Sequence, residues 1–83
     1  MLSDELQQEI ERWTRKLDEK LPRLVARNGP GKEILENARA YRGDSQHFLQ
    51  DDDLIKSFES LIWAWALIET GENLGHLKPS SSS

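Results

Sequence analysis

Residues 61–68, LIWAWALI, are apolar at every position, and the apolar residues on either side of them recur at a helical spacing. A helix with no polar face is covered on all sides or contacts another chain. The chain has 83 residues and no cysteine, so few other elements can cover this helix and no disulfide can stabilise a small core. The fold is therefore limited to one in which the last helix is the centre of packing, the site of a partner contact, or both.

Three helices are predicted, separated by two short breaks. The first begins near Ser3 or Asp4 and carries one apolar stripe at spacings of three and four residues. This stripe consists of Leu6, Ile10, Trp13, Leu17, Leu21 and Leu24. Pro22 lies within the stripe and is expected to kink or restart the helix, because it removes a backbone donor and clashes with the preceding turn.

The sequence NGPG at residues 28–31 ends the first segment, and the second helix is predicted to begin at Gly31 or Lys32 and to reach Leu49. Gly43 in its middle indicates either a close helix crossing or a local bend. One aspartate of residues 51–53 is expected to cap a third helix over 54–74.

Gly75 is expected to end the third helix, since glycine adopts the positive φ of a helix C-terminus. Residues 77–83 contain Pro79 and end in four serines, which is typical of a disordered tail. The predicted fold is therefore all-α: a single helical domain over 1–76 forming a three-helix bundle. Its second and third helices form an antiparallel hairpin, and the N-terminal helix packs across them.

Composition limits which binding partners and which cellular location we expect. Eleven Lys and Arg against fifteen Asp and Glu give a net charge of −4, which argues against a general nucleic-acid binder. The longest apolar run is far shorter than the ~20 residues of a membrane span, and the acidic start lacks the hydrophobic segment of a signal peptide. We expect a soluble cytoplasmic protein with no cofactor, no membrane contact and no nucleic-acid partner.

Four polar residues in the second predicted helix and just after it are candidates for chemistry. Asp44, His47 and Asp51 share one helix face and have donor atoms that suit a divalent metal, but such sites in helical bundles need further carboxylates. Arg42 and His47 match the Arg-x4-His spacing of some helical ribonucleases of the HEPN type. We interpret the cluster as a solvated polar face, and a small ribonuclease-like or metal-dependent enzyme is the alternative.

Basic side chains follow the first predicted helix at spacings of three and four residues. They are Arg12, Lys16, Lys20, Arg23 and Arg27. Such a stripe would suit a phosphate backbone, which makes a nucleic-acid-associated accessory protein a second alternative. The stripe carries no interleaved aromatic residue for base stacking, and the acidic segment 44–59 complements its charge. We therefore interpret it as a solvated or internally paired face.

The third predicted helix supplies the interface candidates. Trp63 and Trp65 diverge by about 200° around a helix, so one indole is expected inside and the other in a contact with a partner. The candidate residues are Leu61, Ile62, Trp63, Trp65 and Leu67. The function we favour is a non-enzymatic protein-interaction module that self-associates, as a homo-oligomer, through this helix; another protein is the alternative partner.

The second half of the chain resembles a known family. The resemblance is carried by Tyr41, Asp44, Ser45, Phe48, Leu49, Asp53, Phe58, Trp63, Ala64, Trp65, Ile68, Glu69, Gly71, Leu74 and Gly75. In this register the chain is similar to archaeal domain-of-unknown-function family 357. The resemblance implies an all-helical fold and an archaeal source, and it implies no substrate or catalytic residue. The chain departs from the family at Asp52, where glycine is usual, and at Ser57, where alanine is usual.

Overall fold

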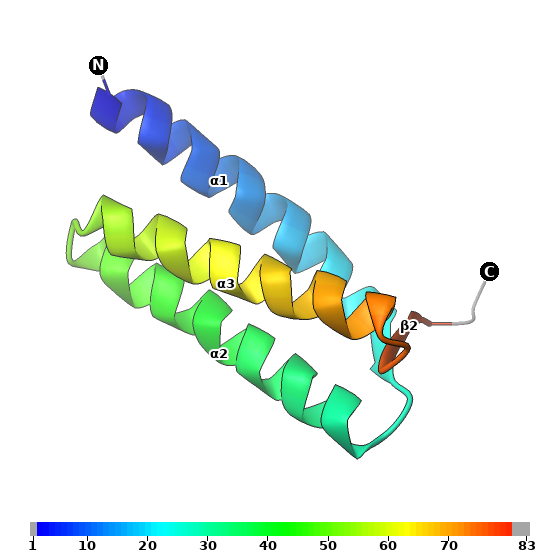
Figure 1. Ribbon diagram of the computed structural model, residues 1–83. Coiled ribbons are helices and arrows are strands. Elements are labelled where there is room, and N and C mark those ends of the chain that lie inside the picture. The colour runs from blue at the N-terminus through cyan, green and yellow to red at the C-terminus, as the bar shows by residue number, and fades with distance from the viewer. Residues whose placement is uncertain (1, 81–83) are drawn as a thin grey trace.

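The three predicted helices are present in the computed structural model, which describes residues 2–80 (Figure 1). Helix α1 spans Leu2–Lys20, α2 spans Gly29–Gln50 and α3 spans Leu54–Asn73. α2 and α3 form an antiparallel hairpin, and α1 runs beside α3 in the same direction. The all-α class and the bundle arrangement are confirmed. A two-stranded sheet is present in addition, at one end of the bundle.

The helix ends follow local sequence signals. The Asn28 side chain accepts a hydrogen bond from the Gly31 amide at 2.9 Å, and Pro30 lies in the first turn of α2, where its missing N–H costs nothing. Asp53 caps α3 by accepting from the Lys56 amide at 3.2 Å. Gly75 has a φ of +80° just after α3, as the sequence predicts. α2 therefore begins at Gly29, two residues before Gly31, because Asn28 caps the helix and Pro30 fits within its first turn.

The first helix differs from the prediction near Pro22. α1 ends at Lys20, a 3-10 turn follows over Leu21–Arg23, and strand β1 spans Leu24–Ala26. The proline lies at the start of the 3-10 turn, where it has no helical partner to lose. Leu21 and Leu24 are buried as the stripe predicts, but they reach the core from a turn and a strand.

The expected tail also differs from the structure at its beginning. Leu77–Pro79 forms strand β2, which pairs antiparallel with β1, and Ala26 lies opposite Leu77. Leu77 is only 3% exposed, so it belongs to the core. The ordered domain thus extends past residue 76, and residues 81–83 of the expected tail lie outside the described residues.

Small residues form the seam between α2 and α3. Ala38 and Ser45 of α2 and Ser57 and Ala64 of α3 are all buried. The Ser57 hydroxyl donates to the Ser45 carbonyl oxygen at 2.8 Å, and the two hydroxyl oxygens lie 2.9 Å apart. Small side chains allow two helices to pack closely, and these hydrogen bonds satisfy the buried hydroxyls. The hydrogen bond explains how a buried serine is accommodated at position 57, where the resemblance implies alanine.

Two glycines allow the C-terminal segment to pack closely against the helices. A Cβ atom on Gly31 would collide with the backbone carbonyl oxygen of His76, and one on Gly71 would meet the Leu77 side chain at 2.8 Å. Gly43 is different, because no atom lies within 4 Å of the place where its Cβ would be. Gly43 is therefore not at a close helix crossing.

These surroundings predict opposite effects for the same substitution. Gly43→Ala should raise the free energy of unfolding by about 0.5–1 kcal/mol, because alanine favours the helix and meets no neighbour. Gly31→Ala should lower it by about 1–3 kcal/mol, because the new methyl displaces the backbone at His76. Urea unfolding followed by circular dichroism measures both. A stabilising Gly31→Ala or a destabilising Gly43→Ala would contradict this assignment.

Candidate interaction surface

One side of α3 belongs to the core. Leu61, Ala64 and Ile68 have no exposed surface. Leu61 was expected among the interface candidates, but it is buried within the chain and is therefore a core residue. Its position follows from the helical spacing of three and four residues that it shares with the other two.

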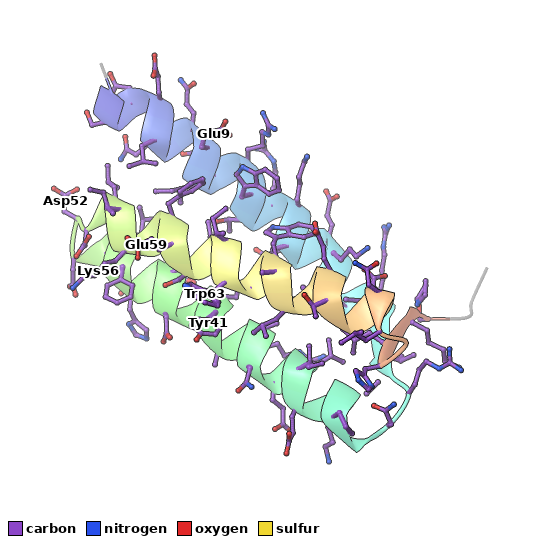
Figure 2. The ribbon with its side chains drawn as sticks, in the orientation of Figure 1. Glu9, Tyr41, Asp52, Lys56, Glu59 and Trp63 are labelled. Carbon is purple, nitrogen blue, oxygen red and sulfur yellow. The ribbon has the colours of Figure 1, made fainter. Side chains whose placement is uncertain are left out.

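The two indoles of α3 diverge as expected. Trp65 is partly buried against Trp13 of α1, with ring centroids 5.7 Å apart in an edge-to-face arrangement. Its Nε1 atom donates a long hydrogen bond to the Trp13 carbonyl oxygen at 3.5 Å. Trp63 lies on the α2 side, where its ring stacks on Tyr41 with centroids 6.2 Å apart (Figure 2). Trp65 is therefore the inner indole and Trp63 the outer one.

A face of α3 remains uncovered by the other helices. Ile55 is 66% exposed, Ile62 is 44% exposed and Trp63 is 58% exposed. The stack on Tyr41 orders the Trp63 ring in a shallow depression that Asn37, Ala40, Asp44 and Leu67 also line. Single exposed apolar residues are common, but three large ones on the exposed half of one helix in a small domain are typical of a contact surface. We call these three residues the uncovered face of α3.

The edge between α1 and α3 is hollowed at both ends. Near the start of α1, a cleft of about 580 Å³ is lined by Glu5, Leu6, Glu9 and Phe58, together with Gln8 and Arg12. Near its end, a second cleft of about 380 Å³ is lined by Lys16, Lys20, Arg23, Leu24, Trp65 and Pro79, together with Glu19 and Glu72. The apolar floors show that α1 does not fully cover the side of α3 that it faces.

The polar cluster of α2 does not assemble into one site. The Arg42 guanidinium turns toward α1 and donates to both carboxylate oxygens of Asp18, at 2.7 and 3.0 Å. This hydrogen bond, together with the charge of Asp18, raises the pKa of Arg42 above its ordinary value, and partial burial opposes the shift. Asp44 and His47 are exposed on another side of α2. Arg42 is thus a link between two helices, held away from His47.

The predicted basic stripe is shorter than expected. Lys16 and Lys20 lie on α1, but Arg23 and Arg27 follow the end of that helix. The Lys20 ammonium pairs with Glu72 of α3 at 3.1 Å, and Arg12 lies 3.8 Å from Glu9. Lys16 places its ammonium 5.0 Å from the Trp13 ring centroid. Part of the basic charge is therefore engaged within the chain.

Two kinds of feature are absent from residues 2–80. No three His, Asp or Glu side chains in this part of the chain gather as they would around a metal ion, and Asp44, His47 and Asp51 form no such group. None of the helices described there combines the length and apolar character required to cross a bilayer.

The fold and its surface define a small three-helix protein with an exposed apolar helix face. The chain belongs to the family described as "Protein of unknown function (DUF357)", whose sequence model matches residues 6–77. It is similar to the crystal structure of protein AF1782 from Archaeoglobus fulgidus, assigned to the same family, at 32% sequence identity and a TM-score of 0.87. The match covers 95% of this chain and 99% of that one. No curated protein matches the chain.

The contact between Arg42 and Asp18 should be measurable as a coupling energy. In a double-mutant cycle with Arg42→Ala and Asp18→Ala, we expect a coupling of about 0.5–1 kcal/mol in the free energy of unfolding, since the pair is bidentate but Asp18 is half exposed. Urea titrations of the four proteins give this value. Strictly additive effects would show that the pair contributes nothing to stability.

Proposed function

We propose that this chain is a non-enzymatic protein-interaction module that self-associates through the uncovered face of α3. The observation that carries the proposal is the exposure of Ile55, Ile62 and Trp63 on a helix whose opposite side forms the core. Burying one side chain of this size completely contributes about 1.5–3 kcal/mol, so their exposure is a substantial unused contribution to stability.

The size of the domain supports a contact of this kind. Small domains bury a low fraction of their surface, and many gain stability from a disulfide, a metal or a partner chain. This chain has no cysteine. A second copy that covers part of α3 would supply the apolar contacts that its own two other helices leave open.

The enzyme alternative receives less support from the geometry. A ribonuclease-like role for Arg42 requires a guanidinium free to hold phosphate near His47, and Arg42 is instead held by Asp18. The nucleic-acid alternative requires a continuous basic stripe, and this one is interrupted by the end of α1 and by the pair with Glu72.

The proposed function predicts that charges on the uncovered face abolish association. The double variant Ile62→Glu/Trp63→Glu should elute as a smaller species than the unmodified chain in size-exclusion chromatography with light scattering, because two carboxylates cannot be buried unpaired. The matched control Gln50→Glu, at an exposed position of α2 away from the uncovered face, should keep the larger mass. Circular dichroism checks that both variants are helical. The proposal is wrong if the folded double variant keeps the mass of the unmodified chain.

A further inference from the structure

α1 is divided by charge along its length. Residues 2–11 contain four Asp or Glu and no Lys or Arg, whereas residues 12–23 contain five Lys or Arg and two Asp or Glu. A division of this sign suits the helix dipole, but the dipole acts only within the first and last turns. Glu9 and Lys16 lie outside those turns of α1. Their placement therefore needs a different explanation.

The charge division coincides with the two clefts between α1 and α3. Glu5 and Glu9 line the cleft near the start of α1, and Lys16 and Lys20 line the one near its end. These four residues lie on one side of the helix, since they follow one another at spacings of four, seven and four residues. Lys20 pairs with Glu72 and Glu9 lies 3.8 Å from Arg12, whereas within residues 2–80 neither Glu5 nor Lys16 takes part in an ion pair. Two acidic residues and Arg12 line the first cleft, and three basic residues with Glu19 and Glu72 line the second, so the edge has a net charge of −1 at one end and +1 at the other.

The apolar part of this edge continues onto the uncovered face of α3. Ile62 follows Phe58 by four residues and precedes Trp65 by three, so it lies on the same side of α3 as both. Phe58 lines the cleft beside Glu9, and Trp65 lines the cleft beside Lys16. Trp63 is rotated about 100° from Ile62, toward Tyr41 of α2. The uncovered face therefore has an α1 side, marked by Ile62, and an α2 side, marked by Trp63.

We propose that a second copy of this chain docks antiparallel on the edge between α1 and α3. The proposal rests on the proposed function and names its contact side and orientation. A two-fold axis close to Trp13 places Glu9 of each copy beside Lys16 of the partner subunit and Glu5 beside Lys20 of the partner subunit. Trp13 contacts Trp65, so the same axis passes within about one turn of Ile62 on α3.

Self-complementarity is what selects a second copy as the occupant. A two-fold contact uses the same patch on both chains, so an acidic residue on one half must meet a basic residue on the other half. An edge that is acidic at one end and basic at the other meets this condition only when the two copies run in opposite directions. The result is a four-helix core made of α1 and α3 from each copy, with Trp63 outside the contact.

A charge-swap experiment tests this orientation. Glu9→Lys alone and Lys16→Glu alone each place like charges together twice in the antiparallel pair, so each should weaken self-association about tenfold. An equimolar mixture should recover the affinity of the unmodified chain, because the lysine introduced in one copy then faces the glutamate introduced in the other. Glu11→Lys and Arg15→Glu are matched controls, since they change the net charge equally on α1 but line neither cleft. Sedimentation velocity over a concentration series gives the dissociation constants.

Cysteine crosslinking gives an independent measure in this cysteine-free chain. Under mild oxidation, a mixture of Glu9→Cys and Lys16→Cys should form a disulfide between copies. Either variant alone should form far less, because two copies of the same position lie about 10 Å apart along the helix, beyond disulfide range. Single variants locate the side: Ile62→Glu should dissociate the pair and Trp63→Glu should not.

The outcomes separate this inference from the proposed function. If the chain associates but the charge variants behave like their controls, or if Trp63→Glu dissociates the pair and Ile62→Glu does not, the antiparallel edge contact is wrong and self-association stands. If the unmodified chain stays a monomer throughout the concentration series, both proposals are wrong. Recovery in the mixture together with the mixed disulfide supports both.

Discussion

The close seam of small residues between α2 and α3 determines how the rest of the molecule packs. Serine and alanine side chains fill this seam, and the Ser57 hydroxyl is satisfied by the Ser45 carbonyl oxygen. Because small residues occupy the side of α3 that faces α2, most of the large apolar residues of α3 lie elsewhere on the helix. Some pack toward α1, as Trp65 does against Trp13, and others remain exposed, as Ile62 does.

The strand pairing at one end of the bundle restricts how far α1 can cover α3. α1 stops at Lys20, and the pairing of β1 with β2 fixes its end near the end of α3. Gly31 and Gly71 permit this closure, since a side chain at either position would meet the segment before β2 or β2 itself. α1 is therefore anchored at one end of the bundle and leaves clefts along its edge with α3.

Much of the fold was predictable from local signals, and the parts that were missed depend on distant partners. The three helices, the Asp53 cap and the Gly75 terminus follow from periodicity and short-range chemistry. Strand β1 was not predicted because Leu24 follows Leu17 and Leu21 at the helical spacing of four and three residues. Its partner strand β2 lies more than fifty residues away, in a segment whose composition resembles a tail.

The candidate surface was likewise predictable only where it depends on local helix geometry. The divergence of Trp63 and Trp65 follows from helix geometry, but which indole lies inside depends on the position of Trp13. The link from Arg42 to Asp18 crosses twenty-four residues of sequence and could not be read from the spacing of Arg42 and His47. Asp52, where the resemblance implies glycine, has a φ of +61°, the backbone region that favours glycine. The resemblance to the family therefore carried information about the turn that composition did not.

The central claim is that α3 has more apolar surface than its own chain covers, and that a second copy covers it. Sedimentation equilibrium of the unmodified chain at tens of micromolar tests this claim most directly. The account predicts a mass approaching twice the 9.6 kDa of one chain, falling toward 9.6 kDa on dilution. A mass of 9.6 kDa at every concentration would contradict it.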